Sequence, residues 1–358
     1  MILKRLKLVN WRNYDSLEIT PPPGLVLISG DNGEGKTNIA EAINYLSLAK
    51  SWRSDESKAL IKEGSATAFI EAEIEENGMN RLIQISLNSG KNGKKASLNG
   101  KTIKKLSELL RVANVILFEP SDATIFTGTP SKRRSFLDVS ISKISTDYLN
   151  TISKYNRLLD ERNALLKTQN PNLDYIDVLT SRMIEEAKTI IGYRSTYINE
   201  LNRSMLLLIP ELYGGKATAK LVYRPFVSLS ENFIEEAKKA FSKALPSDLI
   251  HKSTSVGPHR EDFTFLLGGK DISLYGSRGE NRLGAIALKL SPYFLIEDEG
   301  RKPIAVLDDI YSELDDDHAK RLTNLLLKMG QVFVTDAKIE IKEASNFEVS
   351  KNKAIRRK

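Results

Sequence analysis

Residues 25–46 read LVLISGDNGEGKTNIAEAINYL, an apolar run followed by a glycine-rich loop and a periodic segment. The run at 25–28 is continuous and apolar, as in a strand buried on both faces. From residue 38 to residue 50, apolar residues recur at the 3.6-residue spacing of an amphipathic helix. The loop between them matches the pattern G-x-x-x-x-G-K-[ST]. The sequence therefore predicts a strand, a phosphate-binding loop and a helix, in that order.

In such a loop, glycines let successive backbone amides point at phosphate groups, and the helix that follows adds the positive end of its dipole. Lys36 is expected to neutralise the β and γ phosphates, and the Thr37 hydroxyl is expected to bind Mg²⁺. The predicted ligand is a nucleoside triphosphate with Mg²⁺. The residues predicted to surround it are Gly30, Asp31, Asn32, Gly33, Glu34, Gly35, Lys36 and Thr37.

A magnesium ion at this loop needs an acidic residue at the end of another buried strand. Residues 304–307 form a short apolar run, and Asp308 and Asp309 follow it. Asp308 is predicted to hold Mg²⁺ and Asp309 to polarise an attacking water. A pair of aspartates after a strand is also a common helix N-cap, but the apolar run before it favours the metal site.

The remaining patterns predict a mixed α/β fold with a helical insertion. Period-two alternation at 2–19 and 67–103 indicates antiparallel strands, and Asn99-Gly100 marks a two-residue hairpin turn. Helical spacing at 131–167 and 175–208 predicts two long antiparallel helices or, alternatively, two shorter helices in place of each. Three segments are expected: 1–130 and 211–358 together form the nucleotide-binding head, and 131–210 is the helical insertion.

Composition excludes several classes of protein. The chain has 358 residues, no cysteine and three histidines, so disulfide frameworks, cysteine-ligated zinc and thiol catalysis are excluded. No apolar run approaches the length of a membrane span, and a cytoplasmic location is expected. The net charge is +7, and five of these charges lie in the last eight residues, KNKAIRRK. The segment from Lys351 is expected to be a basic tail, either solvated or bound to nucleic acid.

Several blocks of the sequence resemble the ABC-type ATPases of the SMC-like group, and within that group the RecF family. The blocks are LKLVNWRNY at 6–14, FEPSD at 118–122, GTPSKRRSFLD at 128–138 and GPHRED at 257–262. The resemblance covers nearly the whole chain and implies an ABC-type ATPase head that binds ATP and Mg²⁺. It also implies that Arg12 and Asn13, in the opening motif, help to bind the nucleotide.

YGSRGENR at 275–282 resembles the signature motif of these ATPases, followed by an amphipathic helix. In the resemblance, Ser277 and the amide of Gly279 contact the γ-phosphate of ATP held by a second copy of the chain. Two ATP molecules then lie between two head-to-tail copies. Ser-x-Gly before a helix is also an ordinary N-cap, but signature, helix, strand and acid occur here in the order that this class uses. Residues 312–315, SELD, resemble the loop that crosses the dimer interface.

The sequence departs from the pattern of this group in ways that favour slow hydrolysis. Glu280 and Asn281 stand where relatives commonly carry glutamines, and the position after Asp308 is aspartate and not the longer glutamate of many transporters. No glutamine follows the apolar strand at 112–118. Thr335 and Asp336 stand where a switch histidine would lie.

Lysines crowd around the Asn99-Gly100 turn and form a candidate DNA-binding face, although a solvated surface is an equal alternative. The candidates are Lys91, Lys94, Lys95, Lys101, Lys104 and Lys105, with Arg53 after the first helix as a further candidate. Lys132, Arg133 and Arg134, at the start of the first long helix, are a second candidate face, and for Arg133 and Arg134 a structural role near the nucleotide is an equal alternative. No base-reading motif is present, so sequence-independent binding to duplex, gapped or junction DNA is expected.

The leading functional hypothesis is an ATP-gated DNA clamp that acts in recombinational repair and replication-fork maintenance, with slow, DNA-stimulated hydrolysis. The resemblance implies RecR and RecO as partners, assistance in RecA loading and an ATP-dependent dimer, with no membrane partner. One alternative is a structural SMC-like DNA tether. The other is a P-loop small-molecule kinase, in which the signature motif would have no role.

Overall fold

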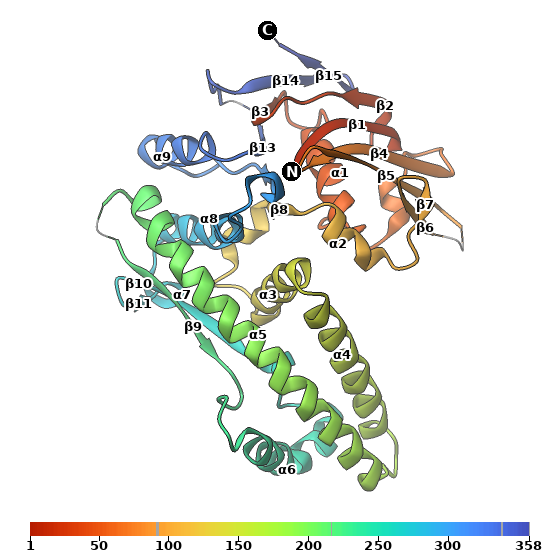
Figure 1. Cartoon of the computed structure of the whole chain (residues 1–358), viewed down its shortest axis with the longest axis vertical. Coiled ribbons are helices and arrows are strands. Elements are labelled where there is room, and N and C mark those ends of the chain that lie inside the picture. Colours follow the sequence, from red (N-terminus) through yellow and green to blue (C-terminus); the bar gives the residue numbers. More distant parts are fainter. Residues whose placement is uncertain (91–92, 216, 338, 358) are drawn as a thin grey trace. The chain divides into compact units, whose positions relative to one another are not determined.

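The computed structural model describes residues 1–90, 93–215, 217–337 and 339–357. The chain divides into two compact units. The first unit comprises residues 1–123, 207–217 and 282–358, and the second comprises 124–206 and 218–281. The first unit contains two sheets, and the second contains one smaller sheet (Figure 1).

The first unit contains a six-stranded sheet in the order β15-β14-β3-β13-β12-β8, here named the P-loop sheet. All its neighbouring pairs are parallel except β14 with β15. The central strand β3 is the apolar run that precedes the glycine-rich loop, as predicted. The strands are β3 (Gly24–Ser29), β8 (Val115–Phe118), β12 (Ile304–Asp308), β13 (Gln331–Asp336), β14 (Ser345–Ser350) and β15 (Lys353–Arg356).

A second sheet of the first unit is antiparallel throughout, in the order β2-β1-β4-β5-β6-β7. Asn99 and Gly100 both have positive φ, 49° and 78°, as a two-residue hairpin turn requires. The predicted alternation and the predicted turn are thus confirmed. The strands are β1 (Ile2–Trp11), β2 (Tyr14–Ile19), β4 (Thr67–Glu76), β5 (Met79–Asn88), β6 (Lys94–Leu98) and β7 (Lys101–Thr102).

Helix α1 (Lys36–Leu48) packs against β8, β12 and β13 of the P-loop sheet and against β1 of the antiparallel sheet (Figure 1). Its apolar residues join the side chains of both sheets in one buried cluster, which includes Ile39, Ile43 and Leu46. This burial fixes the helix directly after the loop. The other helices that lie wholly in this unit are α2 (Leu109–Val112) and α9 (Asp316–Leu326). The chain also forms short 3₁₀ turns at Ser57–Leu60, Leu106–Glu108, Pro120–Thr124 and Glu299–Arg301.

The second unit is mainly helical and carries a three-stranded antiparallel sheet in the order β11-β10-β9. Its strands are β9 (Ala219–Arg224), β10 (Asp262–Leu267) and β11 (Lys270–Asp271). Its helices are α3 (Pro130–Ile144), α4 (Thr146–Leu166), α6 (Phe233–His251) and α7 (Ile272–Tyr275), with a 3₁₀ turn at Pro258–Arg260. Helices α5 (Leu173–Tyr213) and α8 (Arg278–Phe294) begin in the second unit and end in residues of the first.

Two buried arginines hold the second unit together. Arg194 donates to Asp138 at 2.8 Å and to Glu261 at 3.0 Å, and Arg162 donates to Asp248 at 2.9 Å. Both arginines are almost fully buried, so an arginine that lost its acidic partners would carry an uncompensated buried charge.

The structure differs from the leading sequence predictions at three places, and at the first of them it agrees with the alternative prediction of shorter helices. The predicted helix at 131–167 is interrupted at Ser145, whose side chain caps α4 by accepting from the Tyr148 amide, whereas the second predicted helix is continuous. The expected basic tail is not a free tail, because Lys353–Arg356 forms β15 at the edge of the P-loop sheet. Period-two alternation over four residues is too short a signal to identify this strand. The helical insertion is expected to comprise residues 131–210. In the structure, the compact unit that contains it also includes residues 218–281.

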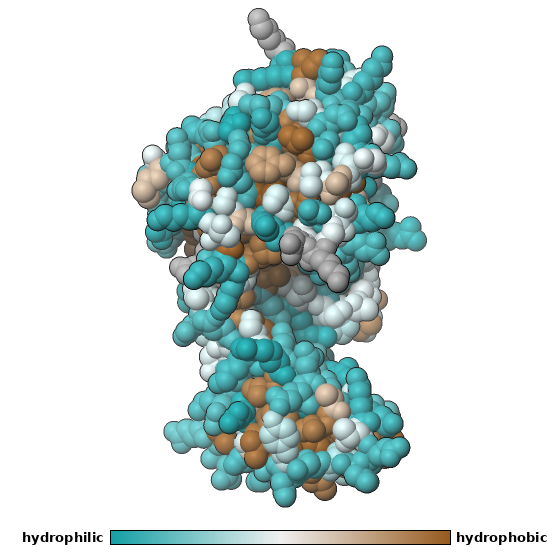
Figure 2. Space-filling view, turned by 90° about the vertical axis from the view of Figure 1, so that its right-hand side faces the viewer, coloured by the Kyte–Doolittle hydropathy of each residue, from teal (hydrophilic) through white to brown (hydrophobic). Residues whose placement is uncertain are grey.

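Among the described residues, no helix has both the length and the apolar character that crossing a lipid bilayer requires. Figure 2 shows one face of the molecule, on which hydrophilic residues predominate and hydrophobic residues form smaller groups.

Gln331 provides a test of the first unit's packing. Its buried side-chain amide accepts from the Leu3 amide at 2.7 Å and donates to the carbonyls of Leu3 and Pro22, so it links β1, β13 and the segment before β3. Gln331→Leu should lower the free energy of unfolding by about 2–3 kcal/mol, because three buried backbone groups lose their partner. Both tryptophans, Trp11 and Trp52, lie in this unit, so their fluorescence during urea unfolding measures it.

The matched control is Gln169→Leu in the exposed turn after α4, which should leave the urea midpoint unchanged. Equal midpoints for Gln331→Leu and the unsubstituted protein would contradict the assigned role of the amide.

Candidate nucleotide-binding site

The glycine-rich loop has a backbone that only glycine accepts at two positions. Gly30 and Gly35 have φ values of 142° and 109°. A Cβ at Gly30 would collide with the Val349 carbonyl of β14, and one at Gly35 would lie 2.7 Å from side-chain atoms of Asn13 and Tyr14. Other residues would therefore be strained and obstructed at both positions.

Lys36 folds back over this loop. Its ammonium donates to the carbonyls of Gly30 at 2.7 Å and Asp31 at 2.9 Å, and the side chain is largely buried. The cation is thus held above the amides that precede α1, where the sequence predicts the β and γ phosphates. Phosphate oxygens at this point would meet a lysine charge and a helix N-terminus together.

Asp308 lies where three elements of the first unit converge. Its Oδ1 atom accepts from the Thr37 hydroxyl at 3.0 Å and from the Thr335 hydroxyl at 2.6 Å, so it joins the start of α1 to the ends of β12 and β13. Burial raises the pKa of this carboxyl, although both hydroxyls oppose the rise. The structure thus brings together Thr37 and Asp308, the two predicted magnesium ligands.

The donor chemistry at this point suits Mg²⁺, which prefers oxygen ligands and commonly takes one or two carboxylates together with phosphate oxygens and waters. The Thr37 hydroxyl and the Asp308 carboxylate are such ligands. Among the described residues, no group of three or more acidic, histidine or cysteine side chains could hold a metal alone. The site therefore fits a cation that is completed by nucleotide phosphates.

Asp309 has an unusual backbone, with φ at 51°. Its amide donates to the Thr335 hydroxyl at 3.1 Å, and Arg282 donates to its carbonyl at 2.8 Å. Burial, followed by the nearby charges of Asp336 and Asp308, raises the pKa of the Asp309 carboxyl. A raised pKa strengthens this carboxylate as a proton acceptor for an attacking water.

These residues line a pocket of about 970 Å³, all of it within the first unit. It includes the loop, both aspartates and the segment that resembles the interface-crossing loop. The lining residues are Asn32, Gly33, Gly35, Lys36, Thr37, Asn38, Arg53, Pro120, Asp308, Asp309, Tyr311, Ser312, Leu314, Asp316, Thr335, Asp336, Ala337 and Ile339.

Three other predicted residues lie near the loop with partners of their own. Arg12 is paired with the fully buried Glu41, through two hydrogen bonds of 2.7 and 2.6 Å. Asn13 donates to the Glu34 carbonyl and accepts from Asn38. Arg53, predicted as a DNA contact, lines the pocket and donates to Asn38 at 2.6 Å, which favours a role at the nucleotide.

In the second unit, the signature motif forms a capping box at the start of α8. The Ser277 amide donates to Glu280 at 2.7 Å, and the Glu280 amide donates to the Ser277 hydroxyl at 3.2 Å. Glu280 is thus folded back on the cap. A Cβ placed at Gly279 would meet nothing within 4 Å, so a ligand can approach its backbone closely.

Asn281 anchors this cap from beneath by donating to the carbonyls of Ile272, Gly276 and Ser277. These contacts place the short side chain of Asn281 within the turn between α7 and α8. Both departures in the signature therefore have structural roles here.

The predicted DNA-binding lysines do not share one environment. The Lys94 ammonium donates to the Ala49 carbonyl at 3.0 Å and lies 5.6 Å from the centre of the Tyr45 ring, and burial lowers its pKa. Lys95, Lys101 and Lys104 are exposed, whereas Lys91 lies outside the described residues. Arg133 and Arg134 have structural roles, since they donate to Asp262 and to the Glu261 carbonyl.

Two contributors to the site are not predicted by the sequence. Thr335 stands out there only as the residue in place of a histidine, yet its hydroxyl joins Asp308 to the Asp309 amide. Its place at the end of an apolar strand is the one signal that could have found it. The turn of the C-terminal hairpin touches the loop, because the Lys351 amide donates to Glu34 and Asn13 donates to Asn352. No sequence pattern predicts this long-range contact.

The chain is similar to proteins of one known family. The family model "RecF/RecN/SMC N terminal domain" matches residues 2–354. DNA replication and repair protein RecF of Clostridium perfringens (strain SM101) is 34% identical over 342 residues, which is 95% of this chain and 94% of the relative. RecF of Clostridium acetobutylicum is 35% identical over 329 residues, covering 91% of this chain and 90% of the relative.

The chain belongs to the RecF family. A solved structure of "the recombination mediator protein RecF-ATPrS in RecFOR pathway" aligns over 99% of this chain and 98% of its own, with 31% identity and a TM-score of 0.90. The predicted ABC-type head with a helical insertion is thereby confirmed.

Asp308→Asn should have different effects on the stability of the protein without nucleotide and on its stabilisation by ATP and Mg²⁺. Because burial raises the pKa of Asp308, its charge opposes folding as pH rises through that pKa. Without nucleotide, the variant should melt at the same temperature as the unsubstituted protein or higher at neutral pH, and this difference should shrink toward acid pH. Thermal melts across pH measure this.

In the same melts, saturating ATP and Mg²⁺ should stabilise the unsubstituted protein, by about 2.7 kcal/mol at a hundredfold excess over Kd. In Asp308→Asn, the part of this stabilisation that depends on Mg²⁺ should be lost. Asp55→Asn, an exposed acid of the same unit, is the control and should behave as the unsubstituted protein. A full Mg²⁺ effect in Asp308→Asn would argue against Asp308 as the metal ligand.

Proposed function

We propose that this chain is an ATP-dependent DNA-binding protein of recombinational repair and replication-fork maintenance. ATP, with Mg²⁺ on Thr37 and Asp308, joins two copies head to tail, and the joined pair holds DNA. The names of the RecF relatives and the ATP-analogue complex of the similar solved structure support this proposal.

Two features of the chain support a site that two copies share. The first is the pocket around Lys36 and Asp308, which presents a cation, loop amides and acids. The second is the cap of α8, where Ser277 and Gly279 are exposed and a ligand can approach the backbone. Leu274 and Tyr275 precede this cap and are 72% and 73% exposed, which suits a surface that a second copy covers.

Hydrolysis would follow from the same residues. Asp309 orients a water and accepts its proton as the water oxygen attacks the γ-phosphorus and the bond to the β-phosphate oxygen breaks. Lys36 stabilises the charge on the phosphates, and Mg²⁺ held by Thr37 and Asp308 would supply further positive charge there. The short aspartate side chain and the threonine in place of a switch histidine favour slow turnover, which suits a clamp that hydrolysis opens.

DNA, a second copy of the chain, RecR and RecO are the proposed partners, and the cytoplasm is the proposed location. The DNA is duplex or gapped, held through its backbone by Lys95 and Lys101 on the antiparallel sheet and by Lys104 in the segment that follows β7. A tethering role suits the structure less well, because α4 has 21 residues. That length gives an arm of only about 32 Å at 1.5 Å per residue.

A mixing experiment tests the composite site. Lys36→Met and Ser277→Arg should each lose nearly all ATPase activity as pure proteins, by at least about a hundredfold, because each pair then lacks one half of both sites. Equal mixtures should regain activity, since a mixed pair contains one site with both halves intact. Steady-state phosphate release measures this.

Ser230→Arg, an exposed serine in the second unit, is the control and should retain full activity alone. Mixtures that remain inactive while both variants still bind ATP, or activity per molecule that stays constant on dilution, would contradict the trans arrangement.

A separate test concerns the lysines. Lys95→Ala with Lys101→Ala and Lys104→Ala should weaken duplex binding and make the slope of log Kd against log salt shallower, by about 0.9 for each phosphate that is no longer neutralised. Fluorescence anisotropy at several salt concentrations measures both effects. Lys94→Ala is the matched comparison, because its ammonium already has the Ala49 carbonyl as a partner. An unchanged salt slope in the triple variant would place the DNA elsewhere.

A further inference from the structure

The second unit contains a pocket of about 590 Å³ that the nucleotide and DNA proposals do not use. It lies between α6, the end of β9 and the loop that leads into β10. Its interior is mainly apolar, and its basic residues are Arg224, Lys243 and Arg260. The complete lining is Arg224, Phe226, Ala240, Lys243, Ala244, Ser255, Val256, Gly257, Arg260, Glu261 and Asp262.

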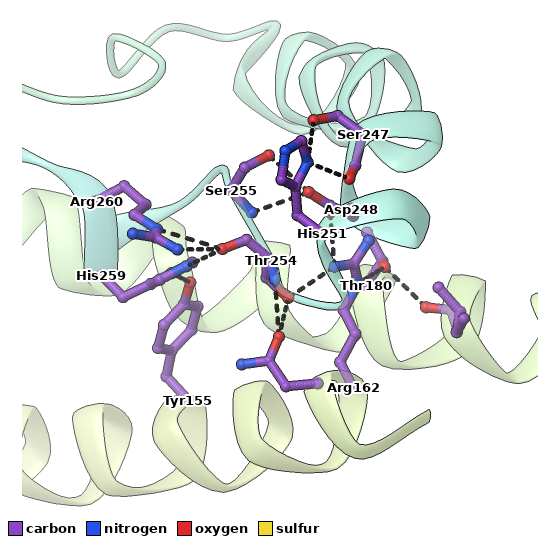
Figure 3. Close-up of polar contacts among 12 residues, drawn as sticks. Tyr155, Arg162, Thr180, Ser247, Asp248, His251, Thr254, Ser255, His259 and Arg260 are labelled. Carbon is purple, nitrogen blue, oxygen red and sulfur yellow. Dashed lines mark hydrogen bonds and ion pairs between the residues drawn. The ribbon is translucent and has the colours of Figure 1, made fainter. Parts of the chain in front are cut away.

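A network of polar groups around the buried residues Arg162, Asp248 and Thr254 holds one wall of this pocket in place (Figure 3). The Asp248 carboxylate of α6 accepts from Arg162 at 2.9 Å and from the Ser255 amide and hydroxyl at 3.0 and 2.6 Å. Thr254 accepts from Arg162 through its hydroxyl at 2.7 Å. The loop that forms the wall is therefore fixed to α4 and α6.

The next residues of the wall are fixed as well. Gly257 has φ at 127°, and a Cβ there would collide with the Tyr155 hydroxyl. That hydroxyl pairs with His259, whose other ring nitrogen lies 3.0 Å from the Thr254 carbonyl. Burial lowers the pKa of His259 to about 4, so the ring is neutral and adds no charge to the wall at neutral pH.

The two acidic residues of the lining are already neutralised by buried partners. Glu261 accepts from Arg194 at 3.0 Å and from Tyr223, and the two carboxylate oxygens of Asp262 accept from Nε and Nη2 of Arg133 at 2.7 and 2.8 Å. They therefore do not balance the pocket's own cations.

The three basic residues remain available for a ligand. Within the described part of the chain, Arg224 and Lys243 form no ion pair, and both are exposed. Arg260 donates through Nε and Nη2 to the Thr254 carbonyl, which carries no net charge, and this orients the guanidinium (Figure 3). The pocket thus combines an apolar interior with an uncompensated positive rim.

We propose that this pocket binds an acidic peptide segment of a partner protein, with one apolar side chain inserted among Phe226, Ala240, Ala244 and Val256. Carboxylates beside that side chain pair with Arg224, Lys243 and Arg260. The apolar interior of the pocket offers little to the phosphate backbone of a duplex, whose contacts need polar groups along a groove. An acidic segment with an apolar anchor satisfies both features of the pocket.

The test uses the full chain and a fluorescein-labelled peptide of aspartate and glutamate residues around one central leucine. Fluorescence anisotropy should show saturable binding. Replacement of that leucine by glycine should weaken binding, because the apolar recess is then left empty. Lys243→Glu and Arg224→Glu should each raise Kd about tenfold or more, because each turns an attraction into a repulsion.

Lys239→Glu is the matched control, since Lys239 is an exposed lysine on the same helix but does not line the pocket, and it should leave Kd nearly unchanged. Absence of saturable peptide binding would overturn the proposal, as would equal Kd values for Lys243→Glu and the unsubstituted protein. Displacement of the peptide by a single-stranded oligonucleotide whose own binding depends on Lys243 would also overturn it, in favour of a nucleic-acid site.

Discussion

The carboxylate of Asp308 connects the fold of the first unit to its chemistry. It is a buried acid that ends a strand with no exposed side chain, and two threonine hydroxyls hold it from neighbouring elements. A buried carboxylate without partners is costly, so these contacts fix the relative positions of α1, β12 and β13. The same arrangement places the Thr37 hydroxyl beside the acid, so that two oxygen atoms suited to Mg²⁺ lie together.

The loop and the acids are predictable from the sequence because each depends on local chemistry. The 25–46 stretch contains a strand, glycines at strained positions and a helix, all within a short segment. The Asp308 strand is an apolar run with an acid at its end. Parallel pairing of β12 and β13 then brings Thr335 to Asp308, a contact that the pattern of either strand alone does not reveal.

The features that the sequence does not predict depend on residues far apart in the chain. The last strand joins the P-loop sheet beside β14, and its turn reaches the glycine-rich loop more than three hundred residues earlier. The basic composition of this segment suggests a solvated tail. Charged residues also occur on the edge strands of sheets, so composition alone does not reveal that the segment pairs with β14. Likewise, residues 218–281 pack with the helical insertion through Arg162 and Arg194, whose acidic partners lie in distant segments. Lys94 resembles its lysine neighbours in sequence, but burial beside Tyr45 distinguishes it.

We propose that a second copy of the chain completes each nucleotide pocket. The chain has no cysteine, so single substitutions allow a direct measurement. Asn32→Cys in one copy and Arg278→Cys in a differently tagged copy place exposed thiols at the loop and at the signature cap. With ATP and a short bismaleimide, we expect cross-links between the two tagged chains. With ADP or without nucleotide, we expect far fewer cross-links. Saturating ATP with no cross-linking between chains would contradict it.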